Sequence, residues 1–274
     1  MWTPASTTRL HCCTRWPTRN FDLGAITCVS GNVALRQVVR NTCSVLDLAD
    51  ARDVPVGPGA DATLLGLGPR PGRQHGANGL GDLPLQASGR EPHRDTAVEL
   101  PAERLRHPER PVALLALAPM TNLAMLARDH LEQIARTIEK LIFVGGRLAN
   151  VHQARPAEFN VGHDPEAAGI ILAVELPRTM YGVDIVNQVV VSEAATTRSA
   201  QSDQPAARLT GEFLWVRHGG LIEDSGALVM LTDPELFKVR PALVQTALYG
   251  AERGRTLIDP AAPIIDVVTA VNAA

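Results

Sequence analysis

The sequence predicts an α/β domain built on an open, mostly parallel sheet flanked by helices, which is a Rossmann-like arrangement. Short apolar runs alternate with amphipathic stretches along the chain, the pattern that strands and crossover helices leave in a parallel sheet. The 274 residues, of which 45% are apolar, can bury one large core. We expect a single domain over residues 21–274, preceded by a segment of different character over residues 1–20.

The first strand, its turn and its helix are predicted near the start of this domain. Residues 23–29 are mostly apolar and favour a strand, after which Ser30-Gly31-Asn32 turns the chain. From residue 33 to residue 48 the apolar side chains fall largely on one side at helical spacing. Residues 57–93 are dense in Gly and Pro, and a loop of this length in a compact domain is more often a functional flap than a linker.

Another strand and helix are expected in the middle of the chain. Residues 112–117 are apolar and predict a buried strand, which Pro119 ends. Thr121 or Asn122 can then cap a helix that runs to about Ile138.

The remaining elements continue the alternation. Residues 141–144 predict a strand that ends in Gly145-Gly146, and Asp164-Pro165 opens a helix in the preferred order of cap and first turn. Further strands are expected over residues 178–183, 242–248 and 264–271.

Composition excludes several classes of partner. The formal charge of -3 comes without a basic patch or an acidic tail, which argues against nucleic acid and against a membrane surface. The apolar runs are far shorter than the roughly 20 residues that cross a bilayer. The four cysteines show neither a disulfide ladder nor a metal-binding spacing, so we expect a cytoplasmic protein.

Polar residues gather where the predicted strands end. In open parallel sheets, ligands bind beyond the carboxyl ends of the strands. The residues that fall there are Asn32, Thr121, Asn122, Gly145, Gly146, Glu158 and Asn160. Ordinary structural roles remain open: Asn32, Thr121 and Asn122 can be helix caps, Asp224 a turn acid, and His75 a solvated loop residue.

These same segments resemble the inosine-uridine-preferring nucleoside hydrolases, in order and in spacing, from about residue 22 to residue 271. The matching fragments are Gly24-Ala25-Ile26-Thr27 with Gly31-Asn32, Asp53-Val54-Pro55-Val56, His75-Gly76-Ala77-Asn78-Gly79-Leu80-Gly81, Pro119-Met120-Thr121-Asn122-Leu123-Ala124, Val144-Gly145-Gly146, Ala157-Glu158-Phe159-Asn160, His163-Asp164-Pro165-Glu166-Ala167-Ala168, and Asp224-Ser225-Gly226-Ala227.

The resemblance implies hydrolysis of the N-glycosidic bond of a ribonucleoside such as inosine or uridine, giving ribose and a free base. It implies a calcium ion bound by an N-terminal aspartate motif, by the carbonyl of Thr121 and by Asp224. A metal-bound water, deprotonated by an aspartate, would attack the anomeric carbon. The matches at Asn32, Glu158 and Asn160 imply contacts with ribose hydroxyls, and His75 would lie near the base or sugar. A homodimer or homotetramer is implied as well.

The chain departs from the family at its beginning. The family motif is Asp-x-Asp-x-x-x-Asp-Asp, but no aspartate precedes Asp22, so no catalytic aspartate base is assigned. Trp is encoded only by TGG and Thr begins with AC, so the frame displaced by one nucleotide reads Asp across Trp2-Thr3. With permitted codons that frame continues as Thr-Gly-Ile-Asp-Asp and then as an apolar helix. We hypothesise that residues 2 to about 20 are the catalytic segment read out of frame, which the coding DNA would decide directly.

Three interpretations follow from the sequence. The first is a nucleoside hydrolase whose chemistry is impaired in this chain by loss of the aspartate motif. The second is a pseudoenzyme that binds ribose or nucleosides without cleaving them, and the third is a pseudogene product that does not fold stably. Nucleoside binding without calcium distinguishes the second from the first, and the absence of cooperative melting identifies the third.

Overall fold

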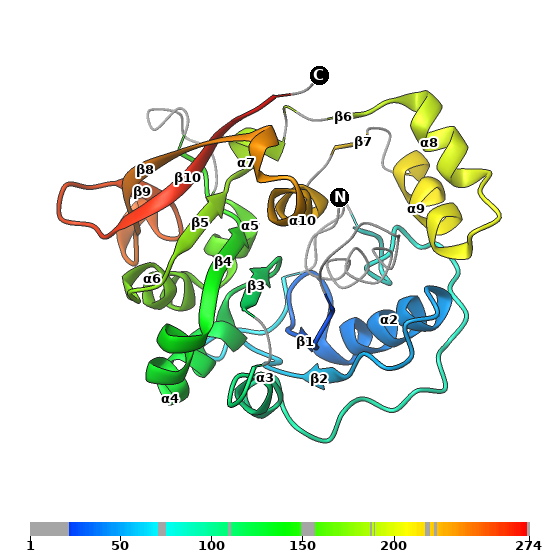
Figure 1. Cartoon of the computed structure of the whole chain (residues 1–274), viewed down its shortest axis with the longest axis horizontal. Coiled ribbons are helices and arrows are strands. Elements are labelled where there is room, and N and C mark those ends of the chain that lie inside the picture. The colour runs from blue at the N-terminus through cyan, green and yellow to red at the C-terminus, as the bar shows by residue number, and fades with distance from the viewer. Residues whose placement is uncertain are drawn as a thin grey trace.

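The computed structural model describes residues 22–70, 75–108, 111–148, 157–186, 188, 190–216, 220–221 and 224–272, in which strands and helices alternate (Figure 1). The strands are β1 Ile26–Cys28, β2 Val56–Pro58, β3 Val112–Ala116, β4 Ile138–Val144, β5 Arg178–Tyr181, β6 Val190–Val191, β7 Gly220–Leu221, β8 Phe237–Thr246, β9 Thr256–Ile258 and β10 Ile264–Val271. The helices are α2 Leu35–Leu48, α3 Glu99–Arg104, α4 Thr121–Thr137, α5 Phe159–His163, α6 Pro165–Ala173, α7 Val183–Val186, α8 Glu193–Ala200, α9 Pro205–Val216 and α10 Asp224–Thr232, with single 3₁₀ turns at Pro234–Leu236 and Gly250–Glu252. Residues 1–20 lie outside the described residues. Our hypotheses about their reading frame and about an altered first strand therefore remain predictions.

The central sheet confirms the predicted α/β fold and is mixed in direction. Its strand order is β3-β4-β5-β10-β8-β9. The pairings from β3 through β4 and β5 to β10 are parallel, whereas β8 pairs antiparallel with both β10 and β9. A separate parallel pair, β1 with β2, aligns Ile26 with Val56. The parallel strands end on the same side, as required for the site that the sequence predicts.

Helices cover both faces of the sheet, as Figure 1 shows around β4 and β5. Leu141 and Phe143 of β4 belong to a core with residues of α4 and α6, whereas Ile142 and Val144 belong to a core with residues of α7 and α10. Successive side chains of a strand point to opposite faces, so the continuous apolar run of β4 is buried on both. This double burial explains why these strands read as apolar runs rather than as alternating ones.

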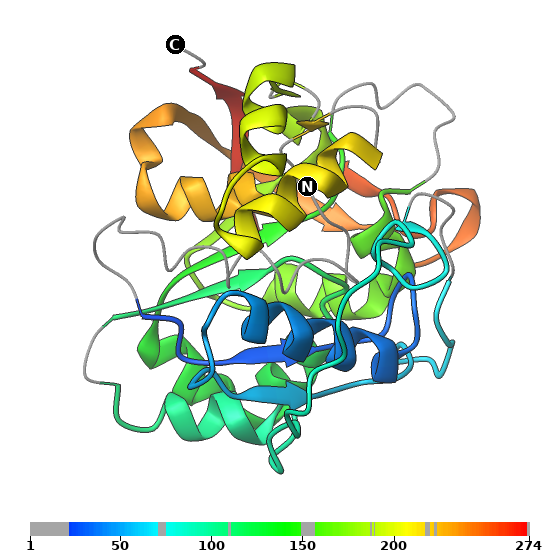
Figure 2. The same cartoon turned by 90° about the vertical axis from the view of Figure 1, so that its right-hand side faces the viewer.

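A second core lies around the β1–β2 pair. Figure 2 shows α2 running alongside these two strands. Val38 and Leu46 of α2 pack with Ile26, Val56 and Leu209, the last from α9. The apolar residues whose spacing predicts the helix therefore form the face that covers β1 and β2.

Among the strands that the sequence predicts, the bounds differ most at β8. This strand begins at Phe237 rather than at Ala242, and most of its first half is exposed. Backbone pairing with β10 extends the strand there, from Phe237 opposite Val271 to Leu243 opposite Ile264. Pairing of this kind leaves no apolar pattern in the sequence. Every helix in the described parts of the chain is too short or too polar to cross a membrane.

Candidate functional site

Glu158 joins α5 to the end of β4. It is the N-cap residue of α5, and its Oε1 accepts a hydrogen bond from the Asn160 backbone N at 2.8 Å. Its Oε2 accepts from the backbone N of Val161 at 3.1 Å and of Gly146 at 2.9 Å. Burial raises the pKa of the Glu158 carboxyl, and the three backbone donors act in the opposite direction. Glu158, which the resemblance assigns to ribose, therefore also fixes the backbone of this corner.

Asn160 is held in one orientation beside Glu158. It is 4% exposed, and its Nδ2 donates to the carbonyl of Val144 at 2.9 Å. Its Oδ1 is buried and has no hydrogen-bond partner among the described residues. An acceptor buried without a donor costs about 1–3 kcal/mol, so this oxygen calls for a ligand that donates a hydrogen bond.

The Gly145-Gly146 pair gives the corner its close approach. Gly145 has a φ of +153° and Gly146 a φ of +78°, conformations that residues with a side chain rarely adopt. A Cβ on Gly145 would lie 2.9 Å from Oε2 of Glu158, and one on Gly146 would lie 2.9 Å from the sulfur of Met180. A side chain at Gly145 would therefore displace Glu158, and one at Gly146 would displace Met180 and Thr256.

Thr121 does not cap α4, because the N-cap position belongs to Met120 and no side chain caps that end. The prediction of a Thr121 or Asn122 cap is therefore wrong. The Thr121 hydroxyl instead donates to Oδ2 of Asp164 at 2.7 Å, which connects the start of α4 to the start of α6. A partner that lies far along the chain outcompetes the local cap.

Asn122 connects the ends of three strands. Its Nδ2 donates to the carbonyl of Cys28 at the end of β1, at 2.8 Å, and its Oδ1 accepts from the backbone N of Ala60 beyond β2, at 2.9 Å. Asn122 itself follows β3. Gly59 has no side chain where this amide passes, and a Cβ there would collide with the Asn122 amide and with the Cys28 carbonyl.

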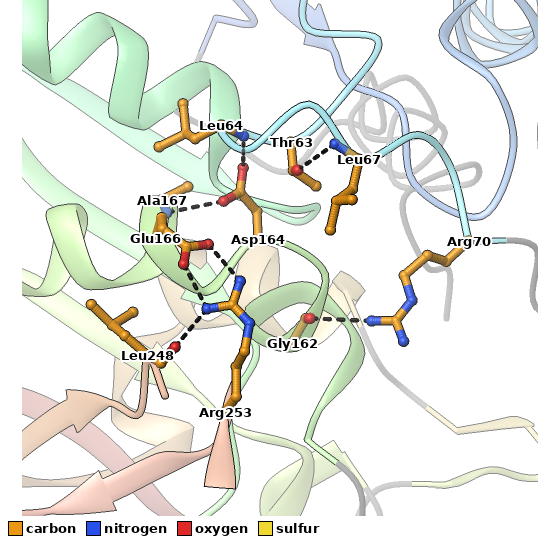
Figure 3. A network of polar contacts seen from close by, with 10 residues as sticks. All are labelled: Thr63, Leu64, Leu67, Arg70, Gly162, Asp164, Glu166, Ala167, Leu248 and Arg253. Atoms are coloured by element: carbon orange, nitrogen blue, oxygen red, sulfur yellow. Dashed lines mark hydrogen bonds and ion pairs between the residues drawn. The ribbon is translucent and has the colours of Figure 1, made fainter. Parts of the chain in front are cut away.

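Asn32 lies in the turn after β1 and is 5% exposed. Arg70 links this turn to α5, which forms, with Glu158 and the Gly145-Gly146 pair, what we call the α5 corner. The backbone N of Arg70 donates to the carbonyl of Gly31 at 2.9 Å, and its guanidinium donates to the carbonyl of Gly162 at 3.3 Å. The arginine thus bridges the turn that carries Asn32 and the helix that carries Asn160 (Figure 3).

Asp224 is the first residue of α10 and is 2% exposed. The helix that Asp224 begins passes close to Tyr181, because a Cβ on Gly226 would collide with the Tyr181 hydroxyl. Burial first, and then the charge of Asp224, raise the pKa of Tyr181 to about 12. The carbonyl of Tyr181 accepts from the backbone N of Gly145 at 3.2 Å, so Tyr181 links α10 to the Gly145-Gly146 pair.

His75 is buried, with 2% exposed, so it is not the solvated loop residue that was one interpretation. Its loop packs on two helices: Asn41 of α2 donates to the carbonyl of Asn78 at 2.9 Å, and Leu80 packs on Phe213 of α9. These contacts place the loop against α2 and α9, and a position of His75 near the base or sugar stays a prediction.

His163 provides a prediction about pH. It is 3% exposed, stacks on Phe159 with 5.4 Å between ring centroids, and neither ring nitrogen has a hydrogen-bond partner in the part of the chain that the structure describes. Burial first, and then the positive charge of Arg70, lower its pKa below 6.5. The unfolded chain therefore takes up a proton first as the pH falls, and stability is lost below about pH 6.5. Denaturant unfolding at pH 7.5 and at 5.5 should show a smaller loss in His163→Phe, and an equal loss in both proteins would contradict the assignment.

The described residues do not by themselves make up the calcium site that the resemblance implies, and residues 1–21, where the family motif would lie, are outside the described part of the chain. Among the described residues, no group of three or more His, Cys, Asp or Glu side chains could hold a metal ion. Thr121 and Asp224 are the two donors that the sequence assigns, whereas calcium takes about 6 to 8 oxygen ligands. These two donors alone therefore do not complete a calcium site.

The comparisons with known proteins now decide the family. The family model "Inosine-uridine preferring nucleoside hydrolase" matches residues 10–274. The chain belongs to this family.

Individual nucleoside hydrolases are similar to this chain in sequence and in structure. The pyrimidine-specific ribonucleoside hydrolase RihA of Enterobacter sp. (strain 638) is 31% identical over 249 residues, covering 86% of this chain and 79% of that protein. The structure of a purine-preferring ribonucleoside hydrolase from Gardnerella vaginalis superposes with a TM-score of 0.84 at 25% identity, covering 98% of this chain and 91% of that chain. A plant nucleoside hydrolase, PpNRh1, has a TM-score of 0.88 at 24% identity, covering 98% and 91% of the two chains, and shows the same fold. Members of this family are ribonucleoside hydrolases, which are glycosidases that act on N-glycosyl compounds.

The structure also identifies residues whose roles the sequence does not reveal. Asp164 is predicted only as a helix cap, but it also binds Thr121 and the backbone of Leu64. Arg70 carries no sequence signal, because a single arginine in a Gly- and Pro-rich loop reads as solvated. The Asp164-Pro165 pair, a cap followed by a first-turn proline, is the signal in the sequence that points to Asp164 itself.

Proposed function

We propose that this chain binds a ribonucleoside through its ribose at the α5 corner, and that hydrolysis of the N-glycosidic bond, the reaction of its family, is impaired in the chain as written. The observation that carries the proposal is the Oδ1 atom of Asn160, a buried acceptor without a partner among the described residues. Its amide is fixed by the Val144 carbonyl, so the acceptor is set in place before any ligand arrives.

A sugar hydroxyl is the kind of group that this oxygen needs. A ribose hydroxyl donates one hydrogen bond and accepts others, and burying it against Oδ1 relieves the cost of the unpaired acceptor. Glu158 beside it accepts three backbone hydrogen bonds, and a carboxylate has about four acceptor positions, so about one remains for a second hydroxyl. Two adjacent fixed acceptors suit a polyol better than an anion.

The impairment follows from the groups that hydrolysis requires. An activated water needs a base and a charge that stabilises the developing transition state. Residues 1–21 contain no Asp or Glu, and the described residues hold no carboxylate cluster for a cation. We propose that calcium binding and hydrolysis of inosine or uridine depend on the aspartates that the displaced reading frame would supply. Cytoplasmic location and a homodimer or homotetramer remain predictions of the sequence.

Replacing Asn160 with Ala tests the binding site. We expect isothermal titration without calcium to show binding of inosine, uridine or ribose to the wild-type chain. Affinity should fall about tenfold or more in Asn160→Ala, the size expected for one buried hydrogen bond to a fixed group. The matched control is Asn41→Ala, which removes a buried asparagine whose Nδ2 bonds Asn78 and whose Oδ1 accepts from Gln37.

Two results would contradict the proposal. One is equal nucleoside affinity in the wild type, Asn160→Ala and Asn41→Ala. The other is a wild-type chain that melts cooperatively yet binds no nucleoside. A chain without cooperative melting would instead support the interpretation as a pseudogene product.

A further inference from the structure

We propose that Asp164 is a positioning residue for nucleoside binding, because it fastens the flap loop, defined as residues 61–70, and the start of α4 to the α5 corner. This inference rests on the proposed function, since it concerns the same ribose site. Figure 3 shows the Asp164 carboxylate between the flap loop and α6. The sequence places this aspartate in a matching fragment and in a capping position, and assigns it no role in binding.

The contacts of Asp164 come from three separate segments. Its Oδ2 accepts from the Thr121 hydroxyl at 2.7 Å and from the backbone N of Leu64 at 2.9 Å. Its Oδ1 accepts from the backbone N of Ala167 at 3.2 Å, which caps α6. Asp164 is 0% exposed, so water does not replace any of these donors. Hydrogen bonds to a buried carboxylate are the strong ones, and loss of any donor leaves charge unsatisfied.

The flap loop is held at the Asp164 attachment, where Leu64 also packs against the main core. Within the loop, the Thr63 hydroxyl accepts from the backbone N of Leu67 at 3.0 Å. Leu65 and Leu67 are 60% and 56% exposed, so these two side chains contribute little apolar burial. The far end is held by Arg70, which bonds Gly31 and Gly162. Asp164 at one end and Arg70 at the other therefore set where the loop lies over the corner.

This placement bears directly on the ribose site. Arg70 binds the turn that carries Asn32, and Asp164 immediately follows α5, which carries Asn160. A flap loop released at Leu64 would no longer hold the Asn32 turn at a fixed distance from Asn160. Binding would then have to order the loop again, which lowers affinity without removing any ribose-contacting group.

A neighbouring ion pair offers a control, because it lies on the same helix, α6, but the hydrogen bonds that form it do not involve the flap loop. Glu166 of α6 forms a bidentate pair with Arg253 at 2.6 and 3.0 Å, and Arg253 also donates to the carbonyl of Leu248 at 2.7 Å. These bonds attach α6 to the segment between β8 and β9 (Figure 3). Weakening them perturbs the same helix and leaves Leu64 and Thr121 bonded to Asp164.

The test compares Asp164→Asn with Glu166→Gln by titration with inosine and by amide hydrogen exchange. An asparagine keeps the shape but offers one acceptor oxygen in place of two and loses the charge. In Asp164→Asn we expect at least tenfold faster exchange at the Leu64 amide and about tenfold weaker nucleoside binding, with cooperative melting retained. Glu166→Gln should change neither quantity by more than about twofold. Unchanged affinity in Asp164→Asn, or an equal loss in both variants, overturns the proposal.

Thr121→Val keeps the proposal testable if Asp164→Asn does not fold. It removes one donor and retains the carboxylate, so we expect an affinity loss of about threefold and unchanged exchange at the amides of residues 224–232. An unchanged affinity would overturn the positioning role. The two proposals fail differently: a folded wild-type chain without nucleoside binding contradicts the proposed function, while faster Leu64 exchange in Asp164→Asn would still show that Asp164 holds the flap loop.

Discussion

Restoring the displaced reading frame over residues 2–20 should convert this chain into an active nucleoside hydrolase. We expect inosine and uridine hydrolysis with calcium present to rise by at least about 10²–10⁴, the usual contribution of a general base, with the metal adding more. The restored segment would read Asp-Thr-Gly-Ile-Asp-Asp and supply the carboxylates that the chain as written lacks. A purified-protein assay of base release, with and without a calcium chelator, measures the effect.

The matched control is a restored chain whose new aspartates are all asparagine. It has the restored length and apolar helix but lacks the charges, so it separates a folding effect from a catalytic one. We expect it to fold like the restored chain and to hydrolyse nucleosides no faster than the chain as written. Equal activity in the chain as written and the restored chain would show that another group has replaced the aspartates, and our account of the site would then be wrong.

Gly59→Ala should destabilise the domain by about 2–4 kcal/mol, the sum of overpacking and the loss of buried hydrogen bonds. The added Cβ would collide with the Asn122 amide and the Cys28 carbonyl, where the ends of β1, β2 and β3 are tied together. Since the Asn32 turn follows Cys28, nucleoside binding should weaken as well. Denaturant unfolding and titration with uridine measure the two effects.

Gly68→Ala is the control for this substitution. A Cβ at Gly68 meets no atom within 4 Å, and the residue needs no left-handed backbone conformation. We expect its stability to change by less than about 1 kcal/mol, in either direction. If Gly59→Ala changed the free energy of unfolding as little as Gly68→Ala, the packing around Asn122 would not be as close as the structure indicates.

The sequence predicts the elements that local patterns encode. Residues 264–271 form β10 with the expected bounds, and the Asp164-Pro165 pair begins α6 as predicted. The apolar stripe of α2 and the buried run of β4 fall where their patterns place them, whereas β3 lies at the predicted position but is only partly buried. The exposed half of β8 is missed because backbone pairing with β10, and not its side chains, makes it a strand.

The sequence predicts which residues belong to the candidate site better than it predicts the hydrogen bonds that these residues make. Motif resemblance selects Glu158 and Asn160, and the structure places both at the end of β4, where Gly146 and Val144 bind them. It does not predict that Glu158 also caps α5, or that Oδ1 of Asn160 has no hydrogen-bond partner among the described residues. Those facts depend on which backbone groups reach the side chains after folding.

By itself, then, the sequence determined the family, the α/β class with its longer central strands, and the absence of carboxylates before Asp22, because these are properties read along the chain. The tertiary structure decided which polar residues fasten the loops to one another. Thr121 and Leu64 reach Asp164 from 43 and 100 residues away, and Asn122 reaches Cys28 across 94 residues. Hydrogen bonds between such distant positions follow from the packing of strand ends against each other, and no local propensity encodes them.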